Sequence, residues 1–449
     1  MVKKTISLII SIFLLCSVFI TPAAAYKPST FELTAEGCLI ANIDTDAIIY
    51  EKNIDEKLFP ASLTKIMTAV VVLDECPNPE NVIVTCSENA INSLLGTDSS
   101  NFNLKIGEQL SALEMLYVLM VHSAGDAANA LAEHFGGSVE GFVAKMNAKA
   151  KALGMANTNF MNAHGLHDDA HYTTPRDMYT LTKYALKNET FKKIFGTVRH
   201  IVPATNLTDH PRTLATTVFI QDPNTSMVDT YYKPVDGGKT GYTDPAGRCL
   251  ITYAEEDGIT YVCVIMKCPV KNEAGVKVRY EFGETKKLYE WVFNEFEYRE
   301  VVSTSTPVGE CPVELSMDAD QVAVVLKTPV NAVVPKEAEP SSFKVEVELS
   351  KSSVKAPVKQ GQELGIATVK YAGDTLATVP VVAITSVEKS GMLAFVDAVV
   401  GFFGSPFFAG IIIALIALII LFIVYVIIIN RKKKRRRRNR NRRKIKVKY

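Results

Sequence analysis

An uninterrupted apolar run near the C-terminus, FFAGIIIALIALIILFIVYVIII (407–429), restricts how the rest of the chain can be organised. It contains no charged residue, and as a helix it is long enough to cross the roughly 30 Å hydrocarbon core of a bilayer. Residues 431–449 follow with 14 Lys and Arg and no acid. This tail could be a nucleic-acid arm, but basic residues directly after a span are typical of a cytoplasmic flank. We therefore predict a transmembrane helix over 407–429 in contact with membrane lipid, a cytoplasmic tail over 430–449, and no nucleic-acid partner.

The N-terminus has the pattern of a secretory signal. Lys3 and Lys4 precede an apolar run over 6–20, and TPAAAY then offers small residues before Tyr26. Cys16 could suggest a lipid-anchored cysteine, but the bulky Leu15 before it argues against that reading. We predict a signal peptide over 1–25 and a single-pass protein of the cell membrane with its catalytic domain outside the cytoplasm. Residues 26–430 carry 33 Lys and Arg against 48 Asp and Glu, so this body is acidic.

The composition changes near residue 300. Before it, helical stretches such as SALEMLYVLM alternate with strand-like pieces such as CLIANI, which predicts an α/β or α+β domain over 26–300. After it, FKVEVELS alternates apolar and charged residues, and we predict a small all-β sandwich domain over 301–390. An interfacial amphipathic segment is expected over 391–406. Seven cysteines remain after signal removal, an odd number that excludes a complete internal disulfide framework.

The stretch FPASLTKIMTAV (59–70) places Ser62 three residues before Lys65 at the start of an apolar helix. Pro60 suits a helix start, so Ser62 is expected in the first turn with Lys65 one turn further along the same face. Ser-x-x-Lys also occurs at 341–344, 352–355 and 386–389, but in strands two such side chains point to opposite faces. A desolvated lysine can act as the base that a serine nucleophile requires.

Two further elements follow in order. HSAGDAANALAEHF contains Ser123, and DGGKTGYTDPAGRCL contains Lys-Thr-Gly at 239–241, which occurs once in the chain. Ser-x-x-Lys, a second serine element and Lys-Thr-Gly in this order are typical of penicillin-binding proteins and class A β-lactamases. Joint agreement by chance is far less probable than any single match.

At these residues the sequence resembles the low-molecular-mass penicillin-binding proteins, which are serine-type D-alanyl-D-alanine carboxypeptidases. The likeness runs from about residue 30 to 390 and includes PASLTKIMTA, VHSAGDAA, GGKTGYTDPAGRCLITYA and GQELGIATV. It implies a penicillin-recognising serine transpeptidase/β-lactamase-like catalytic domain, a β-rich pedestal and a C-terminal anchor. It also implies peptidoglycan stem peptides as substrates and β-lactams as covalent inhibitors, with no cofactor.

The resemblance assigns roles to individual residues. Ser62 would attack the carbonyl between two D-alanines and Lys65 would take its proton, while Ser123 and Lys239 would relay protons. Substrate binding would fall to Lys239, Thr240, Gly241 and Tyr242, with the backbone N–H groups of Ser62 and Tyr242 as the oxyanion hole.

One position departs from the family pattern. The second element usually reads Ser-x-Asn, and here the third residue is Gly125. We expect Gly125 to weaken substrate positioning rather than the nucleophile, so that Gly125→Asn would raise turnover. Asn129, one helical turn further on, is expected to compensate in part.

Three alternatives stay open. HGLHDDAH offers His164, His167 and His171 with Asp168 and Asp169, which would suit a zinc peptidase, but the spacing is not His-Glu-x-x-His and we predict no metal site. A β-lactamase would share the motifs, although a membrane span and β-rich spacer better suit an enzyme that works on a wall polymer. A peptidoglycan-binding scaffold that retains the fold is the third.

Overall fold

The computed structural model describes residues 32–446, so the predicted signal peptide lies outside the described residues. Contacts divide the described chain into two compact units. The first holds the residues up to Val302 together with Val330–Lys344 and Thr368–Thr378, and the second holds the remainder. The chain passes between the units more than once, so a single border at residue 301 stays a prediction.

The first unit is built on a five-stranded antiparallel sheet with the order β2-β1-β9-β8-β7. Leu39 pairs with Val264 and lies on one face, whereas Ile40 pairs with Cys263 and lies on the other. Both faces are buried, which explains why the central strands are apolar throughout. The five strands are β1 (Gly37–Asn42), β2 (Ile48–Lys52), β7 (Val235–Thr243), β8 (Gly247–Glu256) and β9 (Ile259–Cys268).

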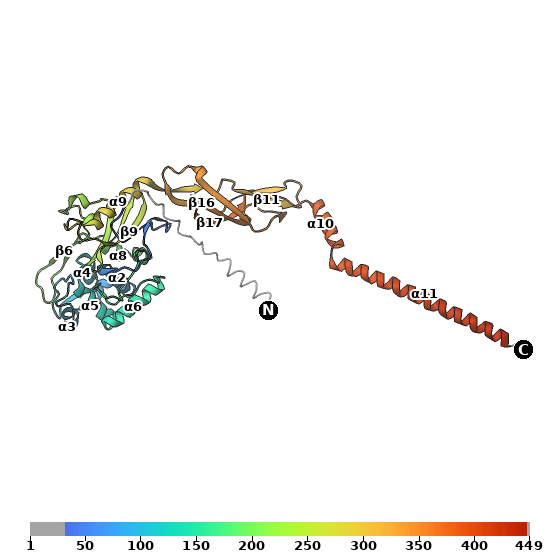
Figure 1. The fold of residues 1–449 in the computed structure, drawn as a ribbon, viewed down its shortest axis with the longest axis horizontal. Helices are drawn as coiled ribbons and strands as arrows, with labels where there is room; N and C mark the ends of the chain where they lie inside the picture. The colour runs from blue at the N-terminus through green and yellow to red at the C-terminus, as the bar shows by residue number, and fades with distance from the viewer. Residues whose placement is uncertain (1–31, 447–449) are drawn as a thin grey trace. The chain divides into compact units, whose positions relative to one another are not determined.

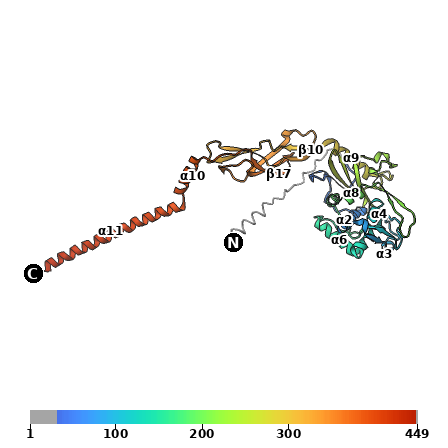
Figure 2. The ribbon, with the colours of Figure 1, turned by 180° about the vertical axis from the view of Figure 1, so that it is seen from behind.

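Helices cover the two faces of this sheet unequally. Helix α9 (Tyr280–Glu295) packs on one face through Phe282, Tyr289 and Val292. A larger helical layer covers the other face, where α2 lies beside α4 (Figure 1, Figure 2). Its helices are α2 (Thr64–Glu75), α3 (Glu88–Asn92), α4 (Ala112–Val121), α5 (Gly125–Gly136), α6 (Val139–Ala152), α7 (Pro175–Ala185) and α8 (Glu189–Phe195). Short two-stranded ladders edge this layer: β3 (Ile83–Thr85) with β4 (Gln109–Ser111), and β5 (Arg199–Val202) with β6 (Arg212–Ala215).

Helix α2 is the central helix of the layer. Every residue from Thr64 to Leu73 is buried, including the polar Thr64, Lys65 and Thr68. An amphipathic surface helix would expose one face to water, so this helix is a core element. Any lysine on it is therefore desolvated by the fold itself.

The region after α9 is β-rich, as predicted. The strand predicted from FKVEVELS is β14 (Phe343–Leu349), whose alternating pattern fits a half-buried strand. The strands form a six-stranded sheet, β14-β16-β17-β12-β11-β15, and a two-stranded ladder of β10 with β13. The other strands are β10 (Phe296–Val302), β11 (Gly309–Glu314), β12 (Gln321–Leu326), β13 (Val330–Pro335), β15 (Val354–Lys355), β16 (Glu363–Tyr371) and β17 (Asp374–Ala383).

Two helices end the described chain. Helix α10 (Gly391–Phe403) has no buried residue. Helix α11 (Pro406–Lys446) includes a segment, Pro406–Arg438, with a mean hydropathy of 3.6 in its most apolar stretch and no burial there. By length and composition it is able to cross a membrane, and the span predicted over 407–429 lies within it.

Candidate active site

Ser62 lies in a tight turn that leads into the buried helix α2. The turn is the 3₁₀ helix η1 (Ala61–Leu63), which leads directly into α2. We expected Ser62 in the first turn of an α-helix, but it lies in this 3₁₀ turn just before the α-helix begins. Ala61 has a φ of +47°, a conformation that costs an L-residue free energy and recurs at functional sites. The tighter turn still places Ser62 Oγ within reach of Lys65, the second residue of α2.

Lys65 links the serine to a neighbouring loop. Its Nζ donates to Ser62 Oγ at 3.0 Å and to the carbonyl oxygen of His164 at 2.5 Å. Burial lowers the pKa of Lys65 to about 7, although the carboxylate of Asp126 acts in the opposite direction. At neutral pH a large fraction of this lysine is therefore uncharged and able to accept a proton from the serine.

The loop 162–171 packs directly on the turn that carries Ser62. Gly165 has a φ of +90°, and a Cβ there would lie 2.0 Å from the carbonyl oxygen of Ala61 and 2.9 Å from Ser62 N. Only glycine permits this approach, because both atoms belong to the backbone. The glycine thus allows the carbonyl of His164 to reach Lys65.

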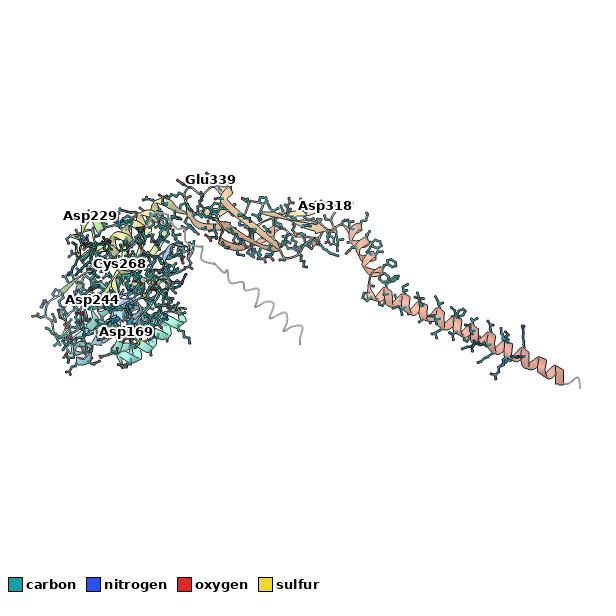
Figure 3. All side chains as sticks on the ribbon, viewed as in Figure 1. Asp169, Asp229, Asp244, Cys268, Asp318 and Glu339 are labelled. Carbon is teal, nitrogen blue, oxygen red and sulfur yellow. The ribbon has the colours of Figure 1, made fainter. Side chains whose placement is uncertain are left out.

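The histidines suggested as zinc ligands have other partners. His171 Nε2 lies 2.9 Å from Thr64 Oγ1, and burial lowers the pKa of His171 to about 4. Burial, with the nearby charge of Lys65, lowers the pKa of His164 to about 3. His167 instead contacts Asp169 at 3.3 Å, and Figure 3 labels this acid on its loop.

Ser123 and Lys239 form the second polar pair of the site. Lys239 Nζ, which is fully buried, donates to Ser123 Oγ at 2.8 Å and to the carbonyl oxygen of Thr240 at 3.0 Å. Burial and the nearby Lys65 hold the pKa of Lys239 well below its usual value. Ser123 has a φ of +63°, so it is a second strained residue of the site.

Strand β7 brings Lys-Thr-Gly to the serine turn. It is the edge of the five-stranded sheet, so backbone groups on its free side have no strand partner. A Cβ at Gly241 would lie 3.0 Å from the carbonyl oxygen of Pro60 and 3.2 Å from Ser62 N, which shows how closely the strand approaches. An extended peptide can bind along such an edge as an additional strand.

Two hydroxyl groups meet on this strand. Thr240 Oγ1 lies 2.5 Å from Thr217 Oγ1. Further along, the Tyr242 hydroxyl donates to Asp244, and this hydrogen bond is the main reason why the pKa of Tyr242 is raised. Figure 3 labels Asp244 in this unit. Tyr242 is 45% exposed, so its ring is accessible at the end of the strand.

The expectation about position 125 is not supported. A Cβ at Gly125 would lie 2.1 Å from Ser99 Oγ, so an asparagine there has no room without movement of that residue. Asn129 does not point to the cleft either. Its amide nitrogen donates to Ser93 Oγ at 3.1 Å and to the carbonyl oxygen of Ala90 at 3.4 Å, both near α3.

Sequence reasoning missed three contributors. Thr217 lies 23 residues before its partner Thr240, in a segment without a motif. The carbonyl of His164 acts through the backbone, which no side-chain pattern reveals. Asp126 follows Gly125, and its carboxylate offsets part of the lowering of the Lys65 pKa by burial; only its place just after the second element could have signalled a role.

Comparisons with known proteins agree with this geometry. Residues 22–269 match the family described as D-alanyl-D-alanine carboxypeptidase, and residues 296–389 match the C-terminal domain of penicillin-binding protein 5. The chain is 31% identical over 370 residues to D-alanyl-D-alanine carboxypeptidase DacF of Bacillus subtilis, covering 82% of this chain and 89% of the relative. It is 29% identical to DacC of Escherichia coli, with the same two coverages.

Solved structures show the same fold. The structure of penicillin-binding protein 5 from Haemophilus influenzae matches with a TM-score of 0.61 at 27% identity, covering 81% of this chain and all of the other. The carboxypeptidase DacD from Francisella tularensis matches with a TM-score of 0.64, covering 85% and 98%, and at 24% identity this likeness concerns the fold alone.

Substitution Gly165→Ala should slow acylation of the protein by penicillin at least about tenfold, because the added methyl group displaces the loop that carries His164. Gly154→Ala is the matched control. Gly154 also has a positive φ, +79°, but nothing lies within 4 Å of its Cβ position. Both variants carry the backbone strain of about 1–3 kcal/mol, and only the first carries the collision. Equal acylation rates for the two variants would contradict the packing argument.

The acylation rate should rise with pH around an apparent pKa of about 7. Burial favours the uncharged form of Lys65, so the base is lost as the pH falls below this value and is fully present above it. Lys65→Arg should reduce acylation about 10²- to 10⁴-fold at every pH, because a guanidinium group stays protonated. Lys151→Arg on the exposed face of α6 is the control. A profile that is flat between pH 6 and 8 would show that another group is the base.

Proposed function

The chain belongs to the D-alanyl-D-alanine carboxypeptidase family, and on that premise we propose that Ser62 is the residue that forms its acyl-enzyme. The enzyme is a serine-type D-alanyl-D-alanine carboxypeptidase, a hydrolase and a penicillin-binding protein. The comparisons do not favour the β-lactamase or scaffold alternatives. The observation that carries the assignment of Ser62 is the 3.0 Å hydrogen bond from the buried Lys65.

In the first step, uncharged Lys65 accepts the proton of Ser62 Oγ as this oxygen attacks the carbonyl between the two D-alanines. The helix start and the edge of β7 surround that carbonyl, so the backbone N–H groups of Ser62 and Tyr242 are the proposed oxyanion hole. The bond between the carbonyl carbon and the leaving nitrogen then breaks. Ser123, hydrogen-bonded to Lys239, is placed to pass a proton to the departing D-alanine, and the proton that Lys65 accepted replaces it by way of Lys239. Lys65, uncharged again, then takes a proton from the water that attacks the ester. It returns this proton to Ser62 Oγ as the ester bond breaks.

The carboxylate of the terminal D-alanine requires its own site. We assign it to the paired hydroxyls of Thr217 and Thr240, with the positive potential of Lys239 behind them. Gly241 keeps the strand close enough for a substrate to contact both these groups and Ser62. The substrates proposed are peptidoglycan stem pentapeptides, and β-lactams are the proposed covalent inhibitors.

We also propose an orientation in the membrane. Signal cleavage before Tyr26 and one span in α11 would leave the catalytic unit outside and the basic tail inside. The support is the cluster of basic residues that directly follows the apolar part of α11.

Intact-protein mass should show one penicillin adduct, and Ser62→Ala should show none. The β-lactam ring opens without a leaving group, so the added mass equals that of the whole drug. Ser62→Ala should also release no D-alanine from a peptide that ends in D-Ala-D-Ala. Ser352→Ala, another serine of a Ser-x-x-Lys pattern, is the control and should behave as the wild type. An adduct that persists in Ser62→Ala would place the nucleophile elsewhere.

Cysteine labelling can test the orientation, because the seven cysteines of the described residues are buried and should give little background. A membrane-impermeant maleimide added to intact cells without an outer membrane should label Asp209→Cys, whose side chain is fully exposed. It should label Arg438→Cys, in the basic tail, only after lysis. The reverse result would invert the topology.

A further inference from the structure

A loop before β4 lies against the start of α5. The 97–104 loop, which we define by these residues, is fixed there by its backbone. Gly125 N donates to the carbonyl oxygen of Ser100 at 2.7 Å, and the buried carboxylate of Asp126 accepts from the N–H groups of Phe102 and Leu104 at 3.0–3.1 Å. Charge-assisted bonds of this kind hold a loop in one conformation.

The fixed loop fills the space that a side chain at position 125 would occupy. A Cβ at Gly125 would lie 2.1 Å from Ser99 Oγ and 3.4 Å from Asn101 Oδ1. Ser99 Oγ in turn donates to Asn101 Oδ1 at 3.2 Å. An amide group therefore lies beside the second serine element, although it comes from a different segment of the chain.

The amide of Asn101 is available for a ligand. Its oxygen is held by Ser99, whereas its nitrogen donates to no protein group within residues 32–446. The side chain is half-buried, so it is accessible but not free in solvent. The alternative amide, Asn129, is committed to Ser93 and Ala90.

The same loop also borders the substrate edge of β7. The carboxylate of Asp98 contributes to the raised pKa of Tyr242, behind the larger effect of Asp244, so Asp98 lies within electrostatic reach of the end of the strand. The loop thus lies near the start of α5 and near the end of β7, two elements that the hydrogen bond of Lys239 to Ser123 also links.

We propose that Asn101 is a substrate-binding residue, which donates its side-chain amide to a backbone carbonyl of the peptide that acylates Ser62. A peptide that binds beside Ser62 loses water from its carbonyl groups. A carbonyl group left without a hydrogen bond would weaken the binding of the transition state. Gly125 offers no side chain for this purpose. The inference rests on the proposed role of Ser62 and adds a residue from outside the three motifs.

The direct test compares Asn101→Ala and Asn101→Asp with the wild-type full chain, using D-alanine release from a D-Ala-D-Ala peptide. Asn101→Asp keeps the acceptor for Ser99, removes the N–H donor and adds a negative charge. Asn101→Ala should lower kcat/KM about two- to tenfold, the range for a neutral hydrogen bond made mainly in the transition state, and Asn101→Asp should lower it at least as much. Asn103→Gly is the matched control. Asn103 is exposed on the same loop and has a φ of +57°, which glycine adopts freely.

A transplant of the amide separates binding from loop structure. Ser99→Gly/Asn101→Gly empties the space, and addition of Gly125→Asn supplies an amide from α5. The triple variant should recover kcat/KM several-fold over the double variant. A purely structural role of Asn101 would give no recovery, because an asparagine at 125 does not restore the Ser99 contact.

Failure of this inference differs from failure of the proposed function. If the wild type forms no penicillin adduct at Ser62, the proposed function is wrong. If the wild type is acylated and Asn101→Asp releases D-alanine with unchanged kcat/KM, Asn101 is not a binding residue while Ser62 keeps its role. An unfolded Asn101→Ala, detected by a lowered Tm, leaves Asn101→Asp and the transplant to decide.

Discussion

The amino group of Lys65 is the point at which three parts of the fold meet. It donates to Ser62 Oγ in the turn before α2 and to the carbonyl oxygen of His164 in the loop 162–171. An exposed lysine would be charged at neutral pH and mobile. The burial of α2 on all sides removes water from this group, and the two acceptors fix its direction. The position of this amino group beside Ser62 therefore depends on a core helix and on a glycine, Gly165, that lets the loop approach.

A second buried lysine, Lys239, lies close to the first. Lys239 lies behind Ser123, and the two lysines disfavour each other's charged form. Two charged lysines buried close together cost free energy when no anion is bound. The carboxylate of a bound peptide would offset part of that free energy. The hydroxyls of Thr217 and Thr240 are neutral, so in the proposed site they would orient the carboxylate while the lysine would attract it. We thus assign attraction of the carboxylate to Lys239 and its orientation to the two threonines.

Local patterns in the sequence were sufficient to predict part of this arrangement. Ser62 and Lys65 are three residues apart, and the alternation that predicts β14 has a period of two. Contacts between segments that are far apart in the sequence could not be predicted. Thr217 lies 23 residues from Thr240 and belongs to no motif. For the β-rich domain, periodicity predicted that strands form, but it could not predict the order in which they pair.

Gly125 shows why a departure from a motif is a weak guide to lost function. From the sequence, the missing side chain predicted a gap in the cleft and a gain from replacing it. In the structure there is no gap, because Asp126 holds the 97–104 loop and thereby places Ser99 and Asn101 in that space. A smaller residue on the helix and a larger group on the loop are therefore complementary in this structure. If Asn101 binds the substrate as proposed, the binding unit is this packed pair of segments rather than the three-residue motif.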